Sequence, residues 1–170
     1  TAGSRDTTAT SANTTSGFSI CTLTTEDADQ ADTYGHGLGV VPTFIIAKTR
    51  SSTNGWFVYH VDVGNDKFLR IETNGAEADN EMWNDTTPTS TLFSLNAANI
   101  GNAVTAVVYC FTPKQGFSKF GKYTGNGNAN GPYVHLGFRP AFIMIKRTDS
   151  TGWWNIIDNK RLGYNVNNPR

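Results

Sequence analysis

The chain has 170 residues, of which 16% are charged, and its 14 basic residues balance its 14 acidic ones. A neutral chain without a basic run lacks the positive surface that nucleic-acid binding requires, so we expect no nucleic-acid partner. No apolar stretch approaches the roughly 20 residues of a membrane-spanning helix, and we expect no membrane insertion.

Residues 1–16 are mostly Thr, Ala, Ser, Gly and Asn without a periodic apolar pattern, which is typical of a linker or arm. From Gly17 onward, short apolar runs alternate with turn signals such as Asn54-Gly55 and Asn74-Gly75. This alternation predicts strands joined by hairpins. The strands expected up to position 115 are Phe18–Leu23, Thr43–Lys48, Trp56–Val61, Phe68–Ile71, Thr91–Leu95 and Val104–Phe111.

Part of this pattern recurs about 98 positions later. Leu38-Gly39 and Phe44-Ile45 are echoed by Leu136-Gly137 and Phe142-Ile143, with a proline at a matched place between them. The recurrence divides the chain into a first repeat (17–115) and a partial second repeat (116–170). We expect the segment to belong to a longer polypeptide. The strands expected in the second repeat are Phe117–Tyr123, Ala141–Lys146 and Trp153–Ile157.

Many short strands with frequent turns predict an all-β protein, an antiparallel β-sandwich built from this repeat. Several strands, among them Val104–Phe111, are apolar on both alternating faces and must be covered on both. A second cover could come from the sister unit, from missing chain or from another copy. We therefore expect a homo-oligomer, with a trimer favoured. Burial is expected for Phe44, Ile46, Val58, Val108, Phe142 and Ile156.

No catalytic signature emerges from the sequence. Ser51, His60 and Asp62 could form a nucleophile–base–acid set on paper, but no G-x-S-x-G motif accompanies them. We expect no enzymatic activity and no cofactor. The acidic run Asp27–Asp32 could offer oxygen ligands to calcium but lacks the glycine and closing glutamate of a calcium loop, so a solvated loop is expected. The cluster Glu77–Asp85 is interpreted in the same way, and no metal site is expected.

The histidines and cysteines have structural interpretations. His36 and His135 both precede a Leu-Gly turn, which favours a turn-capping role, and no histidine pair has zinc-ligand spacing. Cys21 and Cys110 are too few for a disulfide scaffold, and buried free thiols are expected.

Candidate binding residues come from the tryptophans and one glycine-rich loop. Trp56 and Trp153 occupy equivalent places in the two repeats, which favours a core role, whereas Trp83 and Trp154 are the better candidates for surface contacts. Loops are common sites of recognition, and Gly125–Gly131 is rich in residues that permit unusual backbone conformations. The candidate contacts in this loop are Asn126, Asn128 and Asn130.

Several motifs together resemble a repeat family of virion proteins from tailed, mainly marine, bacteriophages. They include Tyr34-Gly35-His36-Gly37-Leu38-Gly39, Trp83-Asn84-Asp85-Thr86-Thr87-Pro88 and the stretch Gly116–Asn130, and the resemblance extends over about residues 18–170. Members of that family are tail-fibre, adhesin-like or other structural proteins.

The resemblance implies a non-enzymatic virion structural module of a tail fibre, spike or capsid surface. It would be assembled in the host cytoplasm and would make contacts with other virion proteins, and it would also mediate host-surface attachment. One alternative is a carbohydrate-binding, lectin-like adhesin that contacts a host surface glycan. A glycan-degrading enzyme is a further alternative, which the missing catalytic signature disfavours.

Overall fold

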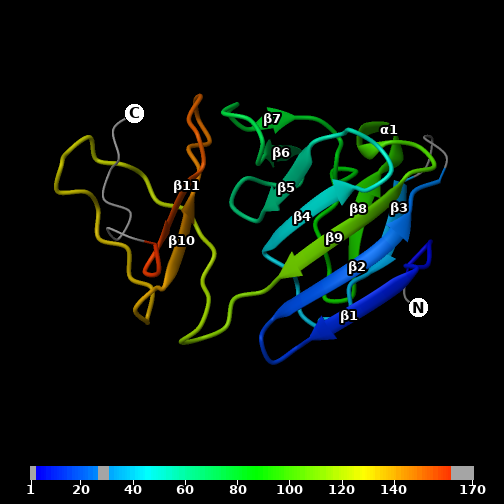
Figure 1. Cartoon of the computed structure of the whole chain (residues 1–170), viewed down its shortest axis with the longest axis horizontal. Coiled ribbons are helices and arrows are strands. Elements are labelled where there is room, and N and C mark those ends of the chain that lie inside the picture. The colour runs from blue at the N-terminus through cyan, green and yellow to red at the C-terminus, as the bar shows by residue number, and fades with distance from the viewer. Residues whose placement is uncertain (1–2, 27–30, 162–170) are drawn as a thin grey trace.

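The computed structural model describes residues 3–26 and 31–161 and is almost entirely β. Its main element is a seven-stranded sheet in the order β1-β2-β9-β4-β5-β6-β7, in which every neighbouring pair is antiparallel (Figure 1). The strands are β1 (Ala9–Asn13), β2 (Phe18–Thr24), β4 (Phe44–Thr49), β5 (Trp56–His60), β6 (Lys67–Arg70), β7 (Ala78–Asp79) and β9 (Thr105–Phe111).

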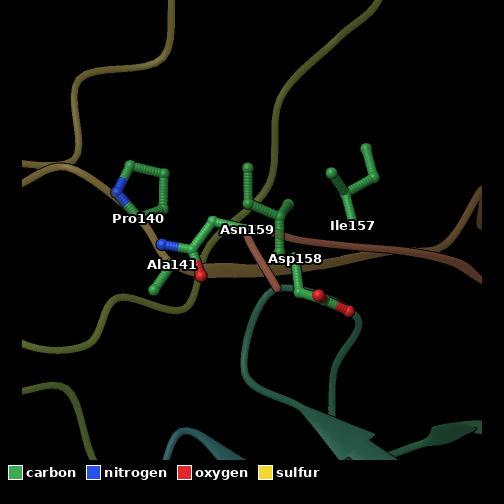
Figure 2. Close-up of a pocket in the computed structure, with 6 residues that line it drawn as sticks. Pro140, Ala141, Ile157, Asp158 and Asn159 are labelled. Carbon is green, nitrogen blue, oxygen red and sulfur yellow. The ribbon is translucent and has the colours of Figure 1, made fainter. Parts of the chain in front are cut away.

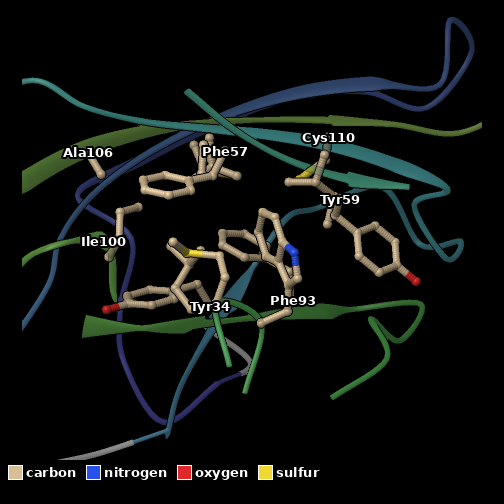
Figure 3. Close-up of a cluster of buried hydrophobic side chains, with 14 of the residues drawn as sticks. Tyr34, Phe57, Tyr59, Phe93, Ile100, Ala106 and Cys110 are labelled. Carbon is tan, nitrogen blue, oxygen red and sulfur yellow. The ribbon is translucent and has the colours of Figure 1, made fainter. Parts of the chain in front are cut away.

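A second layer covers one face of this sheet. It contains the antiparallel pair β3 (Ala31–Gly35) and β8 (Leu92–Asn96), followed by the single-turn helix α1 (Ala97–Ile100), whose first turn is capped by the Asn96 side chain. Tyr34 and Phe93 from this layer face Phe57 of the large sheet across the core (Figure 3). The protein is therefore an antiparallel sandwich, as the strand pattern predicted.

Alternation along the central strands separates the two faces of the large sheet. On β9, Ala106, Val108 and Cys110 are fully buried in the core, while Tyr109 and Phe111 lie on the outer face and are partly exposed. The outer face is covered in part by Phe120, whose ring stacks on Phe44 and also contacts Phe111. Part of the outer face of β4 and β9 is thus covered by the same chain.

The arm prediction for residues 1–16 is wrong over Ala9–Asn13. These five residues form β1, which pairs along its whole length with β2 at the edge of the large sheet. All five side chains are exposed, so β1 carries no apolar alternation that could have been recognised in the sequence. Backbone pairing with β2 organises this strand.

The second repeat forms much less regular structure than the first. Within residues 116–161 the paired strands are β10 (Phe142–Ile145) and β11 (Asn155–Asp158), a hairpin that lies beside the large sheet in Figure 1. The expected strand Phe117–Tyr123 is wrong, because this segment forms only an isolated bridge between Lys114 and Ser118. Its counterpart β2 is held between β1 and β9.

The two hairpins nevertheless share one register. Phe44 pairs with His60 in the first hairpin and Phe142 pairs with Asp158 in the second, each residue 98 positions after its counterpart (44 to 142, 60 to 158). The agreement is limited to the hairpins, because residues 116–141 form no strands matching β2 and β3. A repeat of the whole unit therefore remains a prediction.

The expected core is right in part. Val58 and Val108 are fully buried, whereas Phe44 and Ile46 lie half-buried on the outer face and Ile45 occupies the core. Phe142 and Ile156 were expected inside and are exposed: their places match those of Phe44 and Val58, which lie on the face of the large sheet away from β3 and β8.

Candidate binding surface

Trp83 is a core residue, so the prediction that it contacts a ligand is wrong. Its side chain is 1% exposed, and its indole N–H donates to the Lys67 carbonyl at 3.1 Å. The ring stands edge-on against Tyr59, with 5.7 Å between centroids. The buried indole, whose only donor is hydrogen-bonded, attaches the loop before β8 to the large sheet.

Trp154 anchors the β10–β11 hairpin to the first unit. Its indole N–H donates to the Arg70 carbonyl at 2.7 Å, at the end of β6. Two backbone bonds support this attachment: Gly152 N–H donates to the Asn74 carbonyl at 2.8 Å, and Glu77 N–H donates to the Thr148 carbonyl at 2.9 Å. The indole is half-buried, so Trp154 is first of all a positioning residue for the hairpin.

A lysine closes the turn of each hairpin in the same way. The Lys48 ammonium donates to the Asn54 carbonyl, and the Lys146 ammonium donates to the Gly152 carbonyl at 2.8 Å. Both donors and both acceptors are 98 positions apart (48 to 146, 54 to 152). Desolvation of the Lys146 ammonium lowers its pKa.

The asparagine loop is bonded to itself. Asn128 N–H donates to the Asn126 side chain at 3.1 Å, and Asn130 N–H donates to the Asn128 side chain at 3.0 Å. The Asn126 amide then donates to the Asn130 carbonyl at 3.0 Å. The loop is fully exposed, and these local bonds fix its shape while occupying part of the polar groups expected to contact a ligand.

Large apolar side chains gather on the second repeat instead. Tyr133 is 88% exposed, and Trp153, expected in the core, is 65% exposed. Tyr133 borders a shallow hollow of about 370 Å³ that continues through Leu136 and Phe138. Sequence reasoning missed Tyr133, because an aromatic residue after Gly131-Pro132 carries no signal that separates a surface position from a core position.

The proposed nucleophile–base–acid set is not assembled. Ser51 lies in the turn after β4, where its hydroxyl accepts from Thr105 N–H, while His60 pairs with the first residue of β4 at the other end of the hairpin. Asp62 lies near His60, and its backbone N–H donates to the ring at 3.1 Å. Burial lowers the pKa of His60, and Asp62 opposes this effect.

His36 caps a turn, as expected. The buried ring accepts from Leu38 N–H at 3.2 Å and lies 3.1 Å from the Thr89 carbonyl, so one nitrogen is the acceptor and the other the donor of a neutral imidazole. Burial lowers its pKa. His135, which lies 98 positions after Gly37 (37 to 135), is exposed and caps no such turn.

The expectation of a solvated loop over Asp27–Asp32 is wrong at Asp32, which lies in β3 and has a buried carboxylate. Asp32 is 1% exposed, accepts from the Arg5 guanidinium at 3.0 Å and from the Tyr34 hydroxyl at 3.3 Å. Arg5 also pairs with Glu26. Burial, and next the nearby Asp32 charge, raise the pKa of Tyr34. Asp27 and Asp29 lie outside the described residues.

The described part of the chain, 3–26 and 31–161, holds no group of three or more His, Cys, Asp or Glu side chains arranged to bind a metal ion. The expected free thiols are present, since Cys21 and Cys110 are both fully buried and no disulfide joins them. Desolvation raises the pKa of the Cys110 thiol.

Comparison with known proteins gives a family. The model of the domain of unknown function DUF7483 matches residues 1–170. The chain belongs to the DUF7483 family. No curated protein and no solved structure matches it significantly. In the described ranges of this DUF7483 protein, no helix has the length and apolar character needed to cross a bilayer.

Proposed function

We propose that this DUF7483 protein is a non-enzymatic structural module of a phage particle, located on a tail fibre, spike or capsid surface. The observation that supports a contact-making role is the exposure of large apolar side chains on the second repeat, where Phe117, Tyr133, Phe142 and Trp153 are each more than half exposed. Where such side chains form a contiguous patch, the patch usually marks a protein interface. The placement in a virion rests on the sequence resemblance.

Self-association is proposed through the outer face of the large sheet. Ile20, Tyr109 and Ile46 lie in one cross-strand row, and Ile20 at the β2 end of this row is 36% exposed. A trimer, as in a fibre, would bury this row between copies.

Sedimentation velocity at micromolar concentration tests this proposal. The parent chain should sediment as an oligomer, and Ile20→Lys should shift it toward a monomer, because an ammonium would be desolvated at the contact. Ser90→Lys, which adds the same charge to an exposed loop before β8, should leave the oligomer unchanged. A well-folded parent monomer of 18.5 kDa would refute self-association.

Carbohydrate binding is the second candidate, favoured by the exposed Trp153 indole and the exposed Tyr133 ring. Flat aromatic faces of this kind can stack on sugar rings. A glycan array with the parent and Trp153→Ala tests it: selective binding that disappears in the variant supports the adhesin alternative, and an array without selective binding excludes it for the glycans presented.

A further inference from the structure

Two turns of the first unit have the same tripeptide sequence, Thr-Asn-Gly. One, residues 53–55, connects β4 to β5, and the other, residues 73–75, lies between β6 and β7. In an Asn-Gly pair the glycine nitrogen can attack the side-chain carbonyl carbon of the asparagine, because glycine has no side chain that blocks the approach. Since the local sequence is identical, a difference in this reactivity between the two turns must come from the fold.

The fold restrains Asn54 in the first of these turns. Its side-chain amide donates to the Ile100 carbonyl, and its backbone carbonyl accepts from the Lys48 ammonium. Gly55 is crowded, since a side-chain carbon placed on it would lie 1.9 Å from Oε1 of Glu72. Attack on the Asn54 side chain would break the bond to Ile100 inside a closely packed turn, so the structure protects Asn54.

Asn74 in the second turn is exposed and unrestrained. Across residues 3–26 and 31–161, neither the Asn74 side-chain amide nor the Gly75 N–H makes a hydrogen bond. A side-chain carbon placed on Gly75 would meet only the Thr73 hydroxyl, at 3.6 Å. The attacking nitrogen and the carbon that it attacks are therefore both accessible and free to approach each other.

The main chain of Asn74 also holds the β10–β11 hairpin. The Asn74 carbonyl accepts from Gly152 N–H at 2.8 Å, and the Lys146 ammonium lies 3.5 Å from the same oxygen. Glu77 N–H, which donates to the Thr148 carbonyl, continues this contact. A change in the backbone at Asn74 therefore acts directly on the attachment of the hairpin to the first unit.

We propose that Asn74 is a self-modification site at which deamidation loosens the attachment of the β10–β11 hairpin to the first unit. The Gly75 nitrogen forms a bond to Cγ of Asn74, and the side-chain nitrogen leaves as ammonia together with the Gly75 N–H proton. Water, the only co-reactant, then opens the cyclic imide at either of its two carbonyl carbons. The inference rests on this turn alone and does not require a location in a virion.

The two hydrolysis products affect the hairpin differently. Opening at Cγ gives aspartate and restores the normal main chain. Opening at the backbone carbonyl gives isoaspartate, in which the main chain runs through Cβ and Cγ and is one methylene longer. The carbonyl that accepts from Gly152 then becomes a carboxylate outside the main chain, so the isoaspartate form is the one that loosens the hairpin.

Peptide mapping after incubation of the full chain at mildly alkaline pH tests the modification, with electron-transfer fragmentation to distinguish isoaspartate from aspartate. In the native protein Asn74 should convert at least about tenfold faster than Asn54, whereas in urea the two rates should agree within about twofold. Gly75→Ala, which the turn accommodates, should slow conversion of Asn74 about tenfold and leave Asn54 unchanged. Slower native conversion of Asn74, or the same ratio of rates in urea, would overturn the proposal.

Hydrogen exchange followed by NMR tests the effect on the hairpin. In the purified isoaspartate form the Gly152 amide should exchange about fivefold faster than in the parent, whereas Asn74→Asp, with a carboxylate on a normal main chain, should match the parent. Asn159 N–H donates to the Ala141 carbonyl at 3.1 Å, beside a hollow of about 150 Å³ at the other end of the hairpin (Figure 2), and its exchange should not change. An unchanged Gly152 amide, or equal acceleration at Asn159, would show that isoaspartate does not release the hairpin.

Discussion

Trp83 stands edge-on against Tyr59, with 5.7 Å between ring centroids and 75° between ring planes, and this contact joins the loop before β8 to the centre of the large sheet. Both rings are fully buried. The pair therefore contributes to the stability of the sandwich, and the indole is unavailable to an external ligand.

Truncation of Trp83 should be strongly destabilising. Trp83→Ala should lower the free energy of unfolding by about 3–5 kcal/mol, because it empties an aromatic core site. Trp83→Phe keeps the ring contact but loses the bond to the Lys67 carbonyl, and should cost less. Urea unfolding followed by circular dichroism measures both. A Trp83→Ala protein as stable as the parent would contradict the core assignment.

Ile45 and Ile143 occupy matched positions in the two hairpins, but truncating them to alanine should change the free energy of unfolding by very different amounts. Ile45→Ala should cost about 2–5 kcal/mol, since its side chain is fully buried. Ile143→Ala should change stability by roughly 0.5 kcal/mol or less, because the side chain is only half-buried in the absence of a partner. Equal costs in urea unfolding would show that the second hairpin has a core of its own.

Protonation of His36 should reduce stability at acidic pH. Burial lowers its pKa in the folded state, so below the unfolded value of about 6.5 the unfolded chain binds more protons than the folded chain. This contribution is fully present above pH about 6.5 and is lost as the pH falls toward the folded pKa, with a slope of at most about 1.4 kcal/mol per pH unit. Burial also lowers the pKa of His60, so its protonation should likewise reduce the stability of the fold at acidic pH.

The variant His36→Asn separates the two histidines. Its amide oxygen can still accept from Leu38 N–H but does not titrate in this range. Unfolding in urea at pH 7.5 and 5.5 should show a smaller loss for this variant than for the parent. An identical pH dependence would assign the effect to other groups.

The two thiols should react only when the protein opens. Cys21 and Cys110 are fully buried, and desolvation raises the pKa of Cys110. Modification by a water-soluble disulfide reagent at pH 7.5 should be at least about a hundredfold slower in the native protein than in urea, where both thiols should react. A rapid native phase would indicate a more open β2–β9 region.

The sequence by itself determined the strands of the first unit and the shared hairpin register. Apolar alternation between Phe18 and Phe111 marks strand positions locally, and a period of two fixes which side chains face the core. The equal spacing of Phe44 and Phe142 relative to their turns was enough to predict equal pairing. These features depend on near neighbours in the chain.

Only the tertiary structure decided the rest. The exposed segment β1 is a strand because it pairs with β2. Trp83 is buried because its ring packs against Tyr59 and its N–H donates to the Lys67 carbonyl, both on other elements of the fold. Phe44 is half-buried against Phe120, whereas its counterpart Phe142 is exposed. Whether an apolar side chain lies in the core or on the surface depends on which distant segment packs over it. The residues next to it in the sequence do not specify that segment.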